Sequence, residues 1–172
     1  MPRSDDIAGA LLLGGLLGAA LASSPPGEKA ELAEYRNIKA QVANRINRIG
    51  DLSVLEKLKT KPHLSNLFRE VVGMHSNGFY RGSSLFCSVI MEDALREQLG
   101  AKENYAELID HAKEKRLISA SEAHYLNGTR TDRNNLAHNA TLDCSEEESL
   151  MTILITKKVL QSLVANSLNP GE

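Results

Sequence analysis

The stretch LISASEAHYLNGTRTDRNNLAHNA, residues 117–140, combines a helix start with a dense polar cluster. Ser119 and the glutamate three residues later have the spacing of a capping box, in which each side chain bonds the other residue's backbone N–H group. Beyond this start, Arg130, Asn134 and His138 follow at intervals of four residues. Residues four apart on a helix lie on one face, with a small drift. The stretch therefore predicts a helix that presents a guanidinium, an amide and an imidazole along one stripe.

The rest of the chain after residue 27 carries the same helical signal. Apolar residues recur at three- and four-residue spacing, and no stretch alternates with period two for long enough to favour a strand. The expected helices are residues 28–50, 51–59, 63–73, 79–99, 105–117, 119–139 and 145–168. Gly50, Gly73 and Gly100 are expected to end three of them, because glycine favours the backbone of a helix stop. The pattern predicts an all-α fold.

A long helix is expected over residues 79–99, ahead of the polar cluster. Its inward face is expected to hold Leu85, Phe86, Val89, Ile90, Ala94 and Leu95. Cys87 lies within the same apolar run and is expected in the core. A disulfide between Cys87 and Cys144 is conceivable from the count of two cysteines, but a reducing compartment with free thiols is the simpler interpretation.

The first 24 residues differ in composition from everything that follows. Residues 7–22 carry no charge, and a helix of this length spans about 24 Å, less than the roughly 30 Å of a bilayer core. Small residues recur at every fourth position and form one stripe: Ala10, Gly14, Gly18 and Ala22. Such a stripe lets a second backbone approach closely. We expect a helix for assembly or membrane contact, with burial on the domain as the alternative.

Composition limits the classes of function. The chain has 172 residues, 42% of them hydrophobic, and a formal net charge of −2. This charge balance excludes the class of polybasic proteins that bind nucleic acid through their overall positive charge. A local basic patch would still be enough to bind RNA as a transient substrate. Aromatic residues make up only 4%, so base stacking on aromatic side chains is not the expected binding mode.

The polar cluster allows acid/base chemistry on a phosphate. The imidazole of His138 can move a proton near neutral pH, and arginine suits phosphate oxygens and developing negative charge. Arg133 directly precedes Asn134, so on a helix it lies beside the stripe formed by Arg130, Asn134 and His138. No metal-ligand spacing accompanies these residues, so the set favours RNA transesterification with the 2′-hydroxyl as nucleophile. The structural alternative is a polar helix end whose side chains bond the last free carbonyls.

The string Arg133-Asn134-Asn135-Leu136-Ala137-His138 resembles the Arg-x(4–6)-His motif of the HEPN superfamily, with a polar residue after the arginine. The order of helices from residue 64 to 168 is also similar to that of HEPN domains. The resemblance implies a bundle of four to five helices over residues 61–168. Residues 25–60 would then be a linker with an amphipathic helix, residues 1–24 an extra N-terminal hydrophobic helix, and residues 169–172 a tail.

Active HEPN proteins are metal-independent endoribonucleases that leave 2′,3′-cyclic phosphate ends, and they serve as toxins or antiviral effectors. Their motifs usually meet in a composite cleft between two copies, so the resemblance implies a homodimer or higher oligomer. It assigns His138 as acid/base, Arg133 as phosphate ligand and Asn134 as orienting residue. The four-residue helical spacing adds Arg130 as a substrate contact. Glu92, on the helix expected over residues 79–99, is expected either to pair with Arg133 or Arg130 or to lie on a solvated helix face.

Other HEPN domains lack nuclease activity, so a non-catalytic interaction or scaffold module is the alternative function. Either function leaves room for an antitoxin or sensor protein as partner. Arg69 and His75 satisfy the same motif spacing, but Glu70 follows that arginine and Gly73 is expected to break the helix between them. No cofactor is implied, and a cytoplasmic location with possible membrane association through residues 7–22 is expected.

Overall fold

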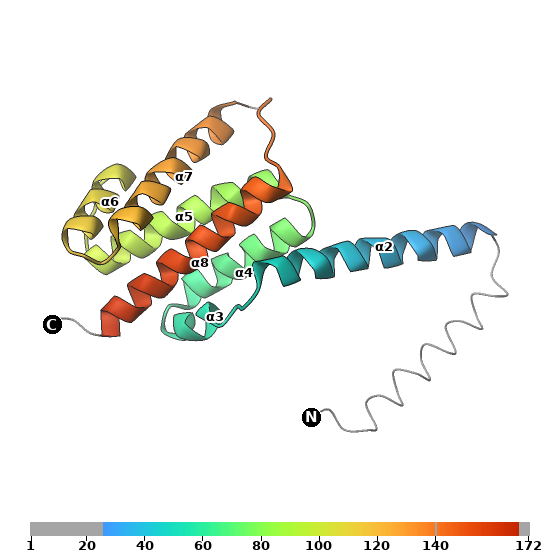
Figure 1. The fold of residues 1–172 in the computed structure, drawn as a ribbon, viewed down its shortest axis with the longest axis horizontal. Helices are drawn as coiled ribbons and strands as arrows, with labels where there is room; N and C mark the ends of the chain where they lie inside the picture. Colours follow the sequence, from blue (N-terminus) through green and yellow to red (C-terminus); the bar gives the residue numbers. More distant parts are fainter. Residues whose placement is uncertain (1–25, 140, 169–172) are drawn as a thin grey trace, which may run out of the picture. The chain divides into compact units, whose positions relative to one another are not determined.

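The computed structural model describes residues 26–139 and 141–168, and every regular element in this part of the chain is a helix (Figure 1). In chain order these are α2 (Pro26–Ile49), α3 (Val54–Lys57), the 3-10 turn η1 (Leu58–Thr60), α4 (Pro62–Ser76), α5 (Tyr80–Leu99), α6 (Tyr105–Glu114), α7 (Ala120–His138) and α8 (Glu146–Leu168). The all-α prediction is confirmed. The small-residue stripe of Ala10, Gly14, Gly18 and Ala22 lies outside the described residues, as does the tail 169–172. Among the helices described, none has the length and apolar character needed to cross a membrane.

The chain divides into two compact units, residues 1–41 and 42–172, and the division falls within α2. In the first unit, Tyr35 and Ile38, which follow the apolar spacing of the helix expected over residues 28–50, are exposed. In the second unit, Ile49 at the end of α2 and Val54 of α3 are buried in the hydrophobic core. This unit begins at residue 42, whereas the bundle implied by the resemblance begins at residue 61.

Helix α5 is the central element of the second unit, since it packs against α4, α6, α7 and α8 (Figure 1). Ile90, Ala94 and Leu95 are buried as expected. Phe86 was expected inward but remains 36% exposed, and serines take much of the inward face instead: Ser83, Ser84 and Ser88. Their small side chains allow close helix packing, and buried hydroxyls are tolerated when they find acceptors. Ser83 Oγ, for example, donates to the Val71 carbonyl at 3.2 Å.

Most helix ends follow the local signals in the sequence. Ser119 makes the expected reciprocal bonds with Glu122, and Ser145 at the start of α8 makes the same two bonds with Glu148. Gly50 and Gly100 end their helices with φ of +72° and +63°. The stop predicted at Gly73 is wrong, because α4 runs through it to Ser76. The turn is instead made two residues after the helix at Gly78, whose φ of +85° is the left-handed backbone that favours glycine.

Candidate functional site

Helix α7 carries the predicted catalytic residues, and its two ends are held by specific contacts. At its start, Ser119 Oγ accepts a hydrogen bond from the Glu122 backbone N–H, at 3.2 Å. At its end, Arg81 of α5 donates to the backbone carbonyls of Leu136 and of Asn139, the latter at 3.0 Å. This guanidinium neutralises the partial negative charge of the helix C-terminus. The backbone on both sides of His138 is therefore fixed to α5.

Arg133 forms an ion pair with Glu92 of α5, which confirms one of the two pairings expected for this glutamate. Nη1 of Arg133 lies 2.6 Å from Oε2 of Glu92, and Nη2 of Arg96 lies 2.7 Å from Oε1. Burial alone would raise the pKa of the Glu92 carboxyl, but the hydrogen bonds and charges of the two arginines outweigh it and lower the pKa. Glu92 is thus an anion held between two cations, and Arg133 is oriented toward α5.

Asn134 and His138 are exposed on the same stripe of α7, as their four-residue spacing predicts. Arg133 precedes His138 by five residues, which separates their Cα directions by about 140° around the helix axis. Arg133 therefore points to α5 while His138 faces solvent at the last turn. Within one chain, the helix brings Asn134 and His138 to a common face but does not direct Arg133 and His138 at one point.

Arg130 is half-buried, and its Nε is buried without a hydrogen-bond partner among the described residues. The hydroxyl of Tyr105, at the first turn of α6, is also buried without a hydrogen-bond partner among these residues, and Tyr105 is only 7% exposed. Burial raises the pKa of Tyr105, with Thr129, Glu92 and Arg133 as its polar and charged neighbours. Buried polar atoms without partners are uncommon in proteins. Tyr105 of α6 therefore lies beside the Glu92–Arg133 pair that joins α5 to α7.

Sequence reasoning missed Tyr105 because its spacing to Leu108, Ile109 and Ala112 is that of an ordinary core position. No local signal distinguishes a core tyrosine whose hydroxyl has a partner from one whose hydroxyl has none.

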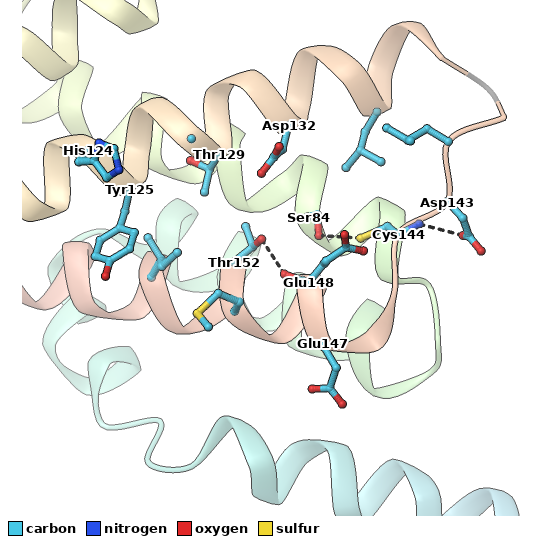
Figure 2. Close-up of a pocket in the computed structure, with 15 residues that line it drawn as sticks. Ser84, His124, Tyr125, Thr129, Asp132, Asp143, Cys144, Glu147, Glu148 and Thr152 are labelled. Carbon is cyan, nitrogen blue, oxygen red and sulfur yellow. Dashed lines mark hydrogen bonds between the residues drawn. The ribbon is translucent and has the colours of Figure 1, made fainter.

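A cavity of about 530 Å³ lies between α7 and α8, and none of the predicted site residues lines it (Figure 2). Its walls include Tyr125, Asp132 and Leu136 from α7 and Glu148 and Met151 from α8. The walls use the side of α7 away from Asn134 and His138. Asn134 and His138 accordingly lie on an open surface, outside this cavity.

A second polar cluster joins the last turns of α2 to α4, α5 and α8. His75 is fully buried, and its Nδ1 lies 2.9 Å from Ser149 Oγ, while its Nε2 has no hydrogen-bond partner among the described residues. Ser149 is also fully buried, so neither group is open to a substrate. The role of this pair is to hold α4 against α8.

Glu146 at the start of α8 is the carboxylate at the centre of the same cluster, in contact with one tyrosine and two arginines. Its carboxylate accepts a hydrogen bond from Tyr80 Oη at 2.6 Å and ion pairs with Arg45 at 3.0 Å and Arg48 at 2.6 Å. The Tyr80 hydroxyl and then the arginines lower the pKa of Glu146 to about 2. The charge also suits the N-terminus of α8, where the helix dipole is positive.

Among the described residues, no group of three or more His, Cys, Asp and Glu side chains is arranged as metal ligands would be. Comparison of the chain with protein-family models, with curated proteins and with solved structures finds no match. The functional argument therefore rests on the residues of α7 and their contacts.

Proposed function

We propose that this chain is a metal-independent endoribonuclease of HEPN type, with its catalytic residues on α7. The observation that supports the proposal most directly is the placement of the motif. Arg133 is oriented by an anionic partner, and Asn134 and His138 are exposed on the same helix, where an RNA strand can reach them. The all-helical fold is compatible with a HEPN-type bundle, and the Arg-x4-His spacing supplies the reaction class.

The chemistry needs a base, an acid and a cation. An RNA 2′-oxygen attacks the adjacent phosphorus, so that a P–O2′ bond forms and the P–O5′ bond breaks. His138 takes the 2′-hydroxyl proton, and the leaving 5′-oxygen takes a proton from His138 of a second copy or from water. Arg133 stabilises the charge that develops on the phosphoryl oxygens. The products carry a 2′,3′-cyclic phosphate and a 5′-hydroxyl. Asn134 orients the reacting groups through its amide.

A homodimer provides the geometry that one chain lacks. Arg133 and His138 diverge by about 140° around α7, so a phosphate cannot meet both from one helix face. When the α7 helices of two copies approach, Arg133 of one copy and His138 of the other can flank the same phosphate. The proposed active site is therefore composite, and activity depends on assembly. Residues 1–24 are proposed to aid this assembly or a membrane contact.

Glu92 acts in this proposal as a positioning residue. Its carboxylate accepts from Nη1 at one edge of the Arg133 guanidinium, which has further N–H donors for a phosphate. The pair therefore sets the direction of the donors and also competes with RNA for them. Arg130, one turn earlier on α7, is proposed as an additional phosphate contact.

The biological role proposed is that of a toxin or antiviral-defence effector, with an antitoxin or sensor protein as regulator. A non-catalytic interaction module is the second candidate, and the separation of Arg133 from His138 within the chain favours it. The two differ in one respect, since only the nuclease requires the imidazole of His138.

The test is cleavage of labelled single-stranded RNA and transfer RNA by the purified, assembled chain in the presence of EDTA. We expect cyclic phosphate ends, and a loss of about a hundredfold or more in rate for His138→Ala and for Arg133→Ala. His124→Ala is the matched control, because His124 is also exposed on α7 but lies outside the motif. RNA left intact by the assembled wild type, or equal cleavage by all variants, would rule out the proposed mechanism.

A further inference from the structure

The cavity between α7 and α8 has the form of a groove that follows both helices. Its α7 wall rises in four-residue steps through His124, Gly128, Asp132 and Leu136, and its α8 wall includes Glu148, Thr152 and Ile155. Twelve helical residues correspond to about 18 Å, or roughly three turns. Ser84 of α5 also lines the groove, between the two walls (Figure 2). The length and direction of the groove are those of a short helical segment.

Apolar side chains that a monomer would normally bury gather at this groove. Tyr125 is 47% exposed, Leu142 41% and Met151 58%, and all three line the cavity. Leu136 and Ile155 complete the apolar surface between them. Single exposed apolar residues are ordinary, but several around one concave surface mark a binding site.

The polar part of the lining is anionic. Asp132, Asp143, Glu147 and Glu148 contribute to it, and no lysine or arginine does. Two cations lie close by, since Arg48 pairs with Glu147 and Arg81 donates to the Leu142 carbonyl at 3.3 Å. Ser145 also donates to the Glu148 carboxylate at 2.8 Å.

Asp132 has no ion pair among the described residues and stands in the middle of the α7 wall. The negative charge left in the groove therefore lies on Asp132, Asp143 and Glu148, beside the apolar surface.

We propose that the α7–α8 groove binds an amphipathic helix of a partner protein, with apolar residues at three- and four-residue spacing flanked by lysine or arginine. Helix-in-groove recognition uses this combination, in which the apolar stripe supplies affinity and the charges set orientation. The charge of the groove selects a basic helix, and its length of about three turns fits a helical segment.

The groove and the proposed catalytic residues occupy different sides of α7. Asn134 follows Asp132 by two residues and so points about 160° away from it. A helix bound in the groove leaves Asn134 and His138 uncovered. The proposal therefore does not depend on RNA cleavage, and it is tested by binding alone.

The experiment uses the full chain and a fluorescent synthetic helix of leucine and lysine in an amphipathic repeat, with fluorescence anisotropy as the readout. We expect saturable binding of this peptide and no binding of a leucine–glutamate version or a scrambled peptide of the same composition. Asp132→Lys and Met151→Asn should each raise the Kd about tenfold or more. Both side chains lie at the surface of the groove, and circular dichroism will check that the variants keep their helices.

Glu70→Lys is the matched control, since Glu70 is an exposed carboxylate on α4 outside the groove. We expect its Kd to stay within about twofold of the wild type. Equal losses in Glu70→Lys and Asp132→Lys would mean attraction to net charge alone and would overturn the proposal, as would an absence of binding. Self-association of the wild type that disappears in Met151→Asn would make a second copy of the chain the occupant and would also overturn it.

Discussion

Glu92 on α5 and Arg133 on α7 are joined by an ion pair of 2.6 Å, at the residue that the proposed mechanism needs as phosphate ligand. The pair links two helices and is not fully exposed, with a second arginine, Arg96, on the other carboxylate oxygen. It serves stability and positions a functional group at the same time. Substituting the carboxylate should therefore affect stability and RNA binding in opposite directions.

Glu92→Gln should lower the free energy of unfolding by about 1 kcal/mol, because a partly exposed charged hydrogen bond contributes roughly that amount. RNA binding should become severalfold tighter, since Arg133 loses an anion that competes with phosphate. Urea unfolding and RNA anisotropy measure the two effects. Glu70→Gln is the control on α4 and should change neither. Weaker RNA binding by Glu92→Gln would mean that the carboxylate chiefly orients Arg133.

The same pair predicts a pH dependence of stability. Because the folded pKa of Glu92 is below 4.5, its ionised form stabilises the fold above that pH, and the contribution is lost as pH falls through the folded pKa. The difference in unfolding free energy between wild type and Glu92→Gln should therefore shrink in acid. A difference that stays constant from neutral pH to below about pH 3 would contradict the role of the charge.

His75 predicts a second pH effect, at milder acidity. Burial lowers its pKa from 6.5, while Glu146 and Glu147 act to raise it and Arg45 and Arg48 to lower it further. The folded chain holds His75 neutral, so below about pH 6.5 the unfolded chain binds a proton that the folded chain does not. Stability should fall with decreasing pH, by up to about 1.4 kcal/mol per pH unit, until the folded pKa is reached.

His75→Gln should remove this dependence between about pH 6.5 and the folded pKa, whatever its effect on stability at neutral pH. The measurement is the urea midpoint as a function of pH. His124→Gln, on the exposed side of α7, is the control and should keep the wild-type slope. An unchanged slope in His75→Gln would assign the acid sensitivity to other groups.

The sequence predicts what depends on neighbours along the chain. The cap at Ser119 and the stops at Gly50 and Gly100 are local arrangements, and the structure has them. The inward face of α5 depends on which helices surround it, and there Phe86 was misplaced and the buried serines were missed. Periodicity identifies hydrophobic residues, whereas a buried serine is decided by close packing and a nearby carbonyl.

The candidate site also has a part that the sequence predicts and a part that depends on how the helices pack. The stripe of Asn134 and His138 follows from spacing on one helix, and opposite charge was enough to suggest Glu92 for Arg133. The groove between α7 and α8 combines Asp132 with Glu148, and its form depends on the relative placement of the two helices. No pattern within either helix contains that information.

Both cysteines are buried and unpaired, and this predicts slow thiol chemistry. Burial raises the pKa of Cys87 to about 12, and burial also raises that of Cys144, which faces the Ser84 hydroxyl at 3.3 Å. Since the thiolate is the reactive form, neither should react quickly with Ellman's reagent in the folded chain at neutral pH. Both should react at once in denaturant. Rapid reaction of Cys144 in the folded chain would show that the groove opens.

Gly73 and Gly78 make a matched pair that tests where α4 ends. Gly73 lies within the helix, and a Cβ placed there meets no heavy atom within 4 Å. Alanine favours a helix interior over glycine by about 1 kcal/mol, so Gly73→Ala should raise the unfolding free energy by roughly 0.5–1 kcal/mol. Gly78 has a φ of +85°, which strains any residue with a Cβ, so Gly78→Ala should lower it by about 1 kcal/mol or more.

Urea unfolding of the two variants distinguishes the observed turn from the one that the sequence pattern favours. If α4 stopped at Gly73, as its position after Val71 and Val72 suggests, Gly73→Ala would instead lower the unfolding free energy. A stabilised Gly73→Ala also bears on the discounted motif, because a continuous α4 carries Arg69 and His75 on one helix. That helix buries His75 completely, so burial, and not a break at Gly73, separates this Arg-x5-His spacing from the exposed one on α7.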